Sequence, residues 1–193
     1  MNKVVAIVGM AGSGKSEVAR IFEDHGFLRV RFGDITDEEM KRRSLARNEA
    51  NERYCRELLR KELGMAAYAI LNQPRIDAAL KKASVVADGL YSWEEYLSFK
   101  SYFGDNFYVV AVYACPRTRY SHLACRPERP LNPEEAASRD KSEIENLNKG
   151  GPIAMADFTI VNETDLKNLK KQTEAVLASL ECQDGRDIET GYR

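Results

Sequence analysis

The chain has 193 residues, of which 44% are hydrophobic, and this length is typical of one domain that buries about 70% of its unfolded surface. Its 29 basic and 30 acidic residues nearly cancel, so we expect neither a general nucleic-acid-binding surface nor a membrane surface. No run approaches the roughly 20 apolar residues of a membrane span, and the four scattered cysteines form no metal or disulfide pattern, which favours free thiols in a cytoplasmic protein.

Residues 9–16 read G-x-x-x-x-G-K-S, the phosphate-binding loop, between a β-branched strand at 3–8 and a helix at 15–24. Glycines let successive N–H groups converge on phosphate oxygens, and the helix start adds its positive dipole end. The Lys15 ammonium would reach the β- and γ-phosphates, and the Ser16 hydroxyl would bind Mg²⁺. The residues expected to hold the nucleotide are Gly9, Ala11, Gly12, Ser13, Gly14, Lys15, Ser16 and Glu17.

An alternating segment at 27–32 predicts a half-exposed edge strand, and Asp34 follows its end. Ligands of open α/β sheets bind beyond the carboxyl ends of the strands, so Asp34 could contact an acceptor or act as a base. The alternative is that Asp34 only caps or turns the chain.

Residues 36–83 are predicted to form a charged helical insertion with Thr36 as its N-cap, divided at Gly64 and Pro74. Three arginines close together on one side suit either an anionic acceptor or a solvated helix face. They are Arg42, Arg43 and Arg47. Five apolar side chains are expected to pack against the sheet: Tyr68, Ile70, Leu71, Ile76 and Leu80.

An apolar strand at 84–89 ends in Asp88-Gly89. A carboxylate at this edge can hold a water on the Mg²⁺ or orient the acceptor, and its alternative role is turn formation. Ser92 and Glu95 predict a capping box for a helix that stops at Gly104.

A central strand is predicted at 107–114, and Pro116 opens the next helix. Interior prolines prevent residues 117–140 from forming one regular helix, which favours a hinged lid over a solvated basic loop. Its arginines are Arg117, Arg119, Arg126, Arg129 and Arg139. Guanidinium groups that close over a transferring phosphoryl group neutralise developing charge, and Arg126 and Arg139 are the expected catalytic pair.

A last strand at 157–162 and an amphipathic helix at 166–180 complete the expected kinase domain, residues 1–181, and residues 182–193 are predicted to be a loose tail. Alternating strands and helices predict an α/β fold with a doubly wound parallel sheet.

At these motifs the chain resembles the nucleoside-monophosphate-kinase superfamily, and most closely dephospho-CoA kinase-like and adenylate-kinase-related proteins of archaeal type. The resemblance rests on G-M-A-G-S-G-K-S, F-G-D, V-V-A-D-G, the arginines with S-R-D, and A-D-F-T-I-V-N. It implies a five-stranded sheet, ATP, Mg²⁺, an acceptor-binding insertion and a lid. By position, Arg126 and Arg139 match lid arginines, and Asn162 matches the region near the adenine.

Two departures concern the acceptor. Adenylate kinases carry an arginine soon after the Asp-Gly of this strand, whereas Leu90-Tyr91-Ser92 follows here, and Asn132 stands where many relatives have an acidic residue. AMP therefore loses support, while dephospho-CoA or another nucleotide stays open.

The leading hypothesis is a kinase that moves the γ-phosphoryl group of ATP to a small anionic nucleotide-like acceptor. An alternative is a regulatory nucleotide switch, because residues 162–165 read N-E-T-D and resemble the guanine-reading N-K-x-D, although Glu163 lacks the lysine stem. A further alternative is an NTPase that acts on a macromolecule and has no small-molecule acceptor.

Overall fold

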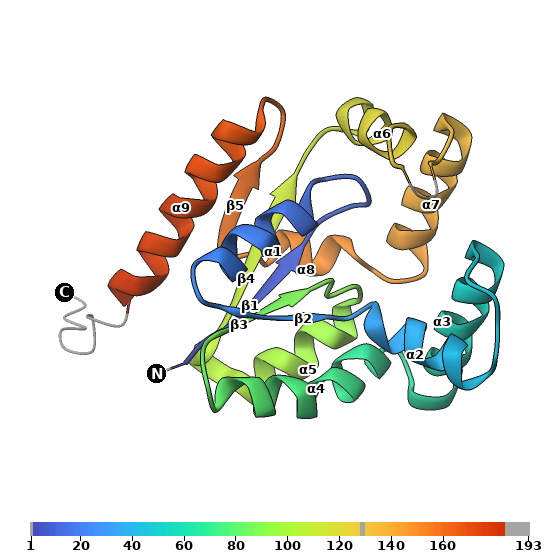
Figure 1. The fold of residues 1–193 in the computed structure, drawn as a ribbon, viewed down its shortest axis with the longest axis horizontal. Coiled ribbons are helices and arrows are strands. Elements are labelled where there is room, and N and C mark those ends of the chain that lie inside the picture. The colour runs from blue at the N-terminus through green and yellow to red at the C-terminus, as the bar shows by residue number, and fades with distance from the viewer. Residues whose placement is uncertain (1, 128–129, 184–193) are drawn as a thin grey trace.

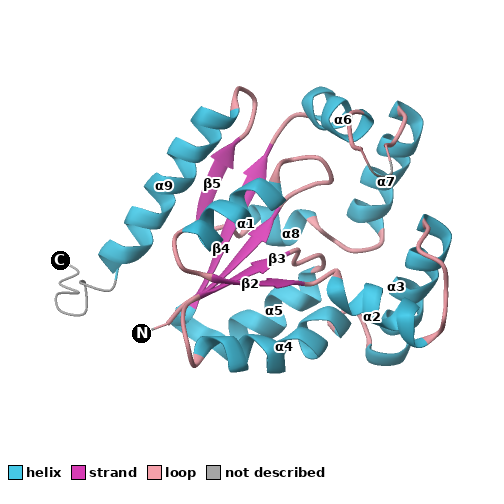
Figure 2. Cartoon of the chain, in the orientation of Figure 1, coloured by secondary structure: helices cyan, strands magenta, loops and turns pink. Residues whose placement is uncertain are grey.

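The computed structural model describes residues 2–127 and 130–183, and in these ranges the chain forms a five-stranded parallel sheet of order β2-β3-β1-β4-β5 (Figure 1). The strands are β1 (Val4–Val8), β2 (Leu28–Arg31), β3 (Val85–Asp88), β4 (Phe107–Tyr113) and β5 (Phe158–Val161). Helices connect successive strands, as Figure 2 shows. The predicted doubly wound α/β fold is confirmed.

The helices form two layers and two peripheral pairs. They are α1 (Lys15–Asp24), α2 (Asp34–Arg42), α3 (Glu49–Leu63), α4 (Ala67–Leu80), α5 (Trp93–Phe103), α6 (Pro116–Ala124), α7 (Pro133–Glu145), α8 (Gly150–Ala154) and α9 (Leu166–Gln183). Helices α1 and α9 pack on one face of the sheet, and α4, α5 and α8 pack on the other. In Figure 1 the pairs α2–α3 and α6–α7 lie to the right, below and above the loop that follows β1.

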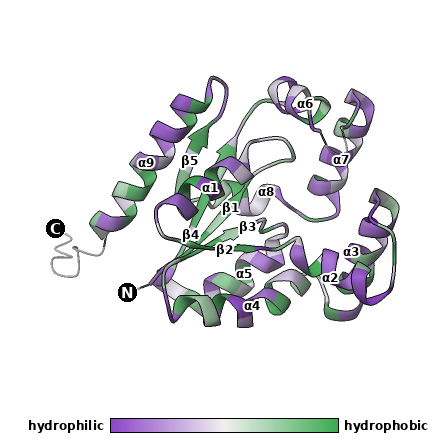
Figure 3. Cartoon of the chain, viewed as in Figure 1, coloured by the Kyte–Doolittle hydropathy of each residue, from purple (hydrophilic) through white to green (hydrophobic). Residues whose placement is uncertain are grey.

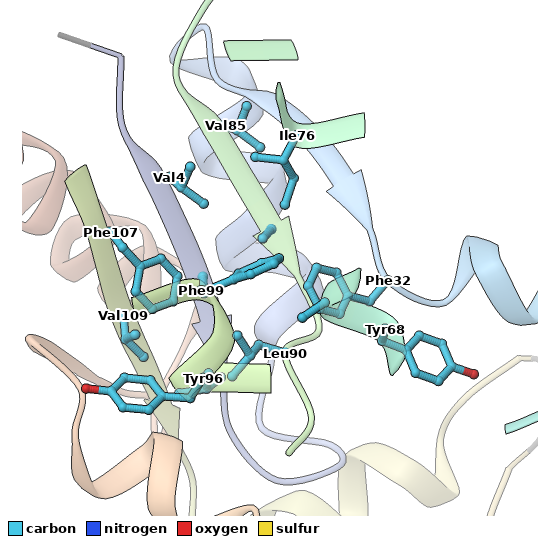
Figure 4. Close-up of a cluster of buried hydrophobic side chains, with 14 of the residues drawn as sticks. Val4, Phe32, Tyr68, Ile76, Val85, Leu90, Tyr96, Phe99, Phe107 and Val109 are labelled. Atoms are coloured by element: carbon cyan, nitrogen blue, oxygen red, sulfur yellow. The ribbon is translucent and has the colours of Figure 1, made fainter. Parts of the chain in front are cut away.

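Alternation along the buried strand β1 builds a core on each face of the sheet. Val4, Ala6 and Val8 pack toward α4 and α5, whereas Val5 and Ile7 pack toward α1 and α9. Each fully buried valine or isoleucine side chain of β1 contributes about 1.5–3 kcal/mol. Figure 4 shows the first core, in which the aromatic rings of α4, α5 and β4 gather. In Figure 3 the inner strands β1, β3 and β4 are mostly hydrophobic, while the outer turns of α3, α7 and α9 carry hydrophilic residues.

The strand register brings two predicted site segments together. Strand β1 lies between β3 and β4, and Ile7 pairs with Asp88, so the loop that begins at Gly9 leaves the sheet beside the Asp88 strand end. Because the chain turns to opposite sides of β1, this edge is the switch point at which ligands bind in such sheets.

The helical insertion differs from its prediction in four places, one of which is a break at residues 43–48 between α2 and α3. Helix α2 begins at Asp34, and Thr36 is not an N-cap but lies inside, where its hydroxyl contacts the Tyr68 hydroxyl at 2.5 Å. Pro74 does not divide the insertion, because α4 continues through it at an exposed position where water can solvate the carbonyl that loses its N–H partner. Ile70 is 46% exposed and does not pack on the sheet.

The predicted helix signals near the insertion are confirmed at α5, where Ser92 and Glu95 form the capping box, and at α3, which ends at Gly64. As predicted, residues 117–140 are not one regular helix but are divided between α6 and α7. Asn132 begins α7 as its N-cap, because its side-chain oxygen accepts a hydrogen bond from the Glu135 N–H at 2.8 Å. Residues 128 and 129 of that segment lie outside the described residues.

At the C-terminus, α9 continues to Gln183, so Cys182 is helical and is not part of a tail. The rest of the predicted tail, residues 184–193, lies outside the described residues. All four cysteines are free, as predicted. Among the described helices, none has the length and apolarity that crossing a membrane requires.

Candidate active site

The loop between β1 and α1 is held in a shape that only glycine permits. Gly9 and Gly14 have φ angles of +142° and +100°, and an added Cβ would lie 2.4 Å from the Val112 carbonyl oxygen and 2.4 Å from Asn162 Nδ2, respectively. The Ser13 hydroxyl is buried and has no hydrogen-bond partner within the described residues. A backbone cradle with an unpartnered buried hydroxyl fits a bound phosphate.

Lys15 folds back over this loop. Its ammonium donates hydrogen bonds to the carbonyl oxygens of Gly9 at 2.8 Å and Met10 at 2.9 Å. Burial and the charge of Lys149 lower the pKa of Lys15 to about 7, although Glu143 and Asp88 oppose the shift. The ammonium thus lies among charges of both signs at the loop.

Ser16 and Glu17 open α1 with exposed side chains. The Ser16 side chain is exposed at the first turn of α1, so its hydroxyl could contact a metal ion bound to phosphates on the loop. The Glu17 carboxylate pairs with Arg20 at 3.1 Å, and its backbone N–H bonds to the Gly14 carbonyl at 3.0 Å. Glu17 therefore orders the first turn of α1 through these contacts.

The loop is fastened from α6 by a buried arginine. Arg119 is 4% exposed, makes a bidentate ion pair with Asp140 at 2.8 and 2.6 Å, and donates to the carbonyl oxygens of Ala11 and Ala114, each at 3.1 Å. Arg119 is therefore a structural clamp between the loop, α6 and α7, and it does not face a substrate as the lid interpretation expected.

Two further side chains hold the loop. Asn162 is buried after β5 and donates from Nδ2 to the Ser13 carbonyl oxygen at 3.0 Å. His122 Nδ1 lies 2.9 Å from the Gly12 carbonyl oxygen. Asn162 thus supports the phosphate loop, because its side-chain amide nitrogen is hydrogen-bonded to the loop backbone.

Asp88 is 9% exposed at the end of β3 and is paired with an arginine that sequence analysis did not single out. Arg29 of β2 donates to Asp88 Oδ2 from Nη2 at 2.5 Å and from Nε at 3.2 Å. The Asp88 charge also acts on Lys15. The structure therefore brings Lys15 and Asp88 into one cluster, with Arg29 at its edge.

Asp34 lies apart from this ion-pair cluster, at the start of α2, where Oδ1 pairs with Arg31 at 3.0 Å and the side chain is 41% exposed. Of the predicted catalytic arginines, Arg139 joins the cluster, because its Nε donates to Glu143 at 3.2 Å and its charge acts on Lys15. Arg126 lies exposed in the turn after α6, and Arg129 lies outside the described residues.

Sequence reasoning missed the centre of this cluster. Lys149 is 1% exposed, its ammonium donates to Glu143 Oε2 at 2.7 Å, and it lies 5.4 Å from the centroid of the Tyr91 ring. Burial lowers the pKa of Lys149, and Glu143 opposes this. A Glu–Lys separation of six residues matches no helical pairing, so the sequence carries no local signal for the pair.

The arginines of the helical insertion are neutralised by carboxylates. Arg42 and Arg43 both bind Glu39, at 2.7 and 2.5 Å, and their hydrogen bonds lower the pKa of Glu39 to about 2. Arg47 lies 3.8 Å from Asp37. A cavity of about 260 Å³ opens beside them, lined by Ile35, Glu38, Glu39, Arg42, Leu59, Leu71 and Arg75.

A second cavity, of about 440 Å³, lies along the start of α6 next to the loop and is lined by Cys115, Arg117, Thr118, Ser121 and His122. Glu163 borders it and caps α6, accepting hydrogen bonds from the Cys115 N–H and from the Thr118 hydroxyl at 2.6 Å. Asp165 accepts from the Asn168 N–H at 2.8 Å at the start of α9. These two carboxylates of the N-E-T-D segment cap helices, which weighs against guanine reading.

A sequence-family model described as "AAA domain" matches residues 5–148. A UPF0200 protein of Thermococcus kodakarensis is 36% identical over 185 residues, covering 92% of this chain and 100% of that protein. A UPF0200 protein of Pyrococcus abyssi is 34% identical over 181 residues, covering 92% and 96%. The chain belongs to the UPF0200 family and carries this AAA domain.

Solved structures share the fold of this UPF0200 family member at low sequence identity. TT1252 from Thermus thermophilus matches with a TM-score of 0.63 at 20% identity, covering 93% of this chain and 98% of that one. A shikimate kinase from Bacteroides thetaiotaomicron matches with 0.60 at 12% identity, again covering 93% and 98%. The architecture is that of P-loop kinases, whereas the names of these relatives and structural neighbours do not point to dephospho-CoA kinases in particular.

Proposed function

We propose that this protein is a phosphotransferase that moves the γ-phosphoryl group of ATP to a small nucleotide-like acceptor, either a dephospho-CoA-like compound or a nucleoside monophosphate. One observation carries the proposal: Lys15 of the loop, Asp88 of the neighbouring strand end and Arg139 of α7 form one electrostatic cluster in a P-loop kinase fold. Phosphoryl transfer needs little beyond such positioning and charge stabilisation.

The donor would lie with its phosphates on the loop N–H groups and its nucleoside toward the 440 Å³ cavity beside α6. Lys15 would neutralise charge on the β- and γ-phosphates. The Ser16 hydroxyl would bind a Mg²⁺ ion, and Asp88 would hold one of its waters, which are oxygen ligands of the kind that Mg²⁺ prefers. The metal would supply charge neutralisation across the phosphates.

The acceptor would approach from the α2–α4 side, where the 260 Å³ cavity is lined by apolar residues and by two arginines with two glutamates. Its oxygen would attack the γ-phosphorus as the bond to the bridging oxygen breaks, releasing ADP. If that oxygen belongs to a hydroxyl, its proton would pass to a carboxylate, for which Asp34 at the start of α2 is the candidate. Leu90-Tyr91-Ser92 follow Asp88-Gly89 where adenylate kinases carry an arginine, which favours a hydroxyl acceptor over AMP.

The named neighbours support the reaction class. Besides the shikimate kinase, a gluconokinase from Sinorhizobium meliloti matches with a TM-score of 0.61 at 11% identity, covering 96% of this chain. Both names denote kinases, and the resemblance of the motifs to dephospho-CoA kinase-like proteins supports a nucleotide-like acceptor.

The test is an acceptor panel. The purified chain is incubated with γ-labelled ATP or GTP, Mg²⁺ and one acceptor at a time: dephospho-CoA, the nucleoside monophosphates or the nucleosides, with Lys15→Ala as the control. Label transferred to one small acceptor, and lost in the control, is the expected result. Tight GTP binding without transfer to any acceptor would overturn the proposal in favour of a regulatory switch.

A further inference from the structure

The turn between α7 and α8 inserts a lysine into the interior beside the phosphate loop. Lys149 is 1% exposed and its ammonium binds Glu143 Oε2 at 2.7 Å, while Glu143 Oε1 receives Arg139 Nε at 3.2 Å. One carboxylate therefore holds two cations. Removing a lysine ammonium from water is costly and one shared carboxylate offsets it only in part, so packing alone gives no reason for a lysine here.

The position of this lysine is fixed by the backbone around it. The Lys149 N–H bonds to the Glu143 carbonyl oxygen at 3.3 Å, and the Trp93 N–H bonds to the Leu147 carbonyl oxygen at 3.3 Å. A Cβ added to Gly151 would lie 2.6 Å from the Trp93 ring, and Asn148 has a φ of +49°. The turn is thus pressed against the segment that follows Asp88, and the ammonium is held in one place.

Two cations share one carboxylate beside the loop. Lys149 and Arg139 both bind Glu143, while Asp88 is engaged by Arg29, which also lies 3.6 Å from Glu23. Lys15 donates to the backbone carbonyl oxygens of Gly9 and Met10, and both it and buried Glu95, which acts on Lys149, have a pKa moved to about 7, so each is partly charged at neutral pH. Two cations on one carboxylate next to the loop lysine suit a multiply charged anion.

We propose that Lys149 is a second phosphate-binding lysine, which contacts the phosphoryl group being transferred, and that Glu143 is a positioning residue that aims Lys149 and Arg139 together. The inference rests on the proposed function and adds to it a cation from outside the loop. A hydrogen-bonded ammonium at the γ-phosphoryl group stabilises the charge that grows on its oxygens.

The test measures binding of inorganic tripolyphosphate and of ATP by calorimetry, with turnover on whichever acceptor the parent uses. Lys149→Gln should weaken tripolyphosphate binding about 10-fold or more and lower kcat, because a charge-assisted hydrogen bond is lost. Lys149→Arg should recover part of both. Lys141→Gln is the matched control, because Lys141 is an exposed lysine of α7 that pairs only loosely with Glu145, at 4.0 Å.

Glu143→Gln tests the positioning role and should weaken tripolyphosphate binding less than Lys149→Gln, while lowering kcat. Thermal unfolding of every variant separates lost binding from lost folding. If Lys149→Gln does not fold, the neutral pair Glu143→Gln with Lys149→Gln replaces it, because that variant leaves no unpaired buried charge.

The two proposals fail in different ways. Parental tripolyphosphate binding in a folded Lys149→Gln variant, together with a loss in Lys15→Met, overturns the role of Lys149 and leaves the proposed function intact. A parent protein that binds neither tripolyphosphate nor ATP overturns both.

Discussion

Lys15 illustrates how the residues of the loop serve binding more than folding. Its ammonium caps two loop carbonyls and lies near Lys149, and burial lowers its pKa to about 7. A lysine whose pKa is lowered by folding costs free energy in its charged form. An anionic ligand would compensate that cost.

Lys15→Ala is expected to lower phosphoryl transfer by about 10²-fold or more, because charge on the phosphates is no longer neutralised. The same change should leave the thermal unfolding midpoint at neutral pH equal or higher, since it removes a desolvated cation. Circular dichroism melting and a transfer assay measure the two quantities. Near-normal turnover in the variant would contradict the catalytic role of the loop.

Asp88→Asn is expected to slow transfer about 10-fold or more and to raise the Mg²⁺ concentration for half-maximal rate, while ATP binding changes less. The charge matters here, because Asn keeps the shape and can still accept from Arg29. Arg29→Gln is the matched control: it breaks the same ion pair but leaves the carboxylate. Equal metal dependence in parent and Asp88→Asn, at a normal rate, would leave Asp88 as a turn former.

At the scale of elements, the arginines of α6 and α7 have two different roles. Arg119 is buried and ties α6 to Asp140 of α7 and to the loop, whereas Arg139 reaches Glu143 and the Lys15 cluster. Helix α6 therefore holds the loop through Arg119 at Ala11 and through His122 at Gly12, and α7 joins this contact through the Arg119–Asp140 ion pair. This arrangement holds the loop from α6 and leaves Arg139 of α7 close enough for its charge to act on Lys15.

Arg126→Ala and Arg139→Ala are expected to lower kcat more than they raise KM for ATP, as groups aligned only when both substrates are bound contribute little to ground-state binding. The loss at Arg139 can reach the 10³- to 10⁵-fold range of arginine fingers. Lys141→Ala is the control on the same helix. A rise in KM at constant kcat would indicate plain ground-state binding.

The lid hypothesis has a separate physical check. Proteolytic cleavage between residues 127 and 137 should be suppressed by ATP together with the true acceptor, because closure excludes the protease as it excludes water. Equal cleavage with and without both ligands would show that this segment does not close.

At the scale of the whole molecule, buried carboxylates set the pH dependence of stability with opposite signs. Arg42 and Arg43 lower the pKa of Glu39 to about 2, so its contribution is lost only as the pH falls from 4.5 toward 2. Burial raises the pKa of Glu95 from 4.5 to about 7. Between pH 4.5 and pH 7 the folded state binds more protons at Glu95 than the unfolded state does, so Glu95 lowers the free energy of unfolding as the pH rises.

Glu95→Gln is therefore expected to flatten the fall in unfolding free energy between pH 4.5 and 7, by an amount on the order of 1–3 kcal/mol. The amide oxygen can still accept from the N–H groups of Tyr91 and Ser92, so the cap remains. Urea unfolding at pH 5 and pH 7 measures the slope, with exposed Glu145→Gln as the control. An unchanged slope in Glu95→Gln would assign the pH dependence to other groups.

The sequence by itself determined what depends on neighbours along the chain. The loop motif from Gly9 to Ser16, the capping box at Ser92 and the stop at Gly104 each act over a few residues, so their spacing predicts the local structure. The order of strands and helices then predicted the parallel sheet, since short connections and right-handed crossovers leave few arrangements.

Tertiary structure alone decided which side chains meet. The ion pair of Arg119 with Asp140 joins two helices, the pairing of Arg29 with Asp88 joins two strands, and Lys149 reaches the loop from a turn more than a hundred residues away. Such contacts follow from the packing of whole elements, and their energies depend on burial that no local pattern encodes. For that reason the sequence predicted the phosphate loop, whereas only the fold revealed the second lysine beside it.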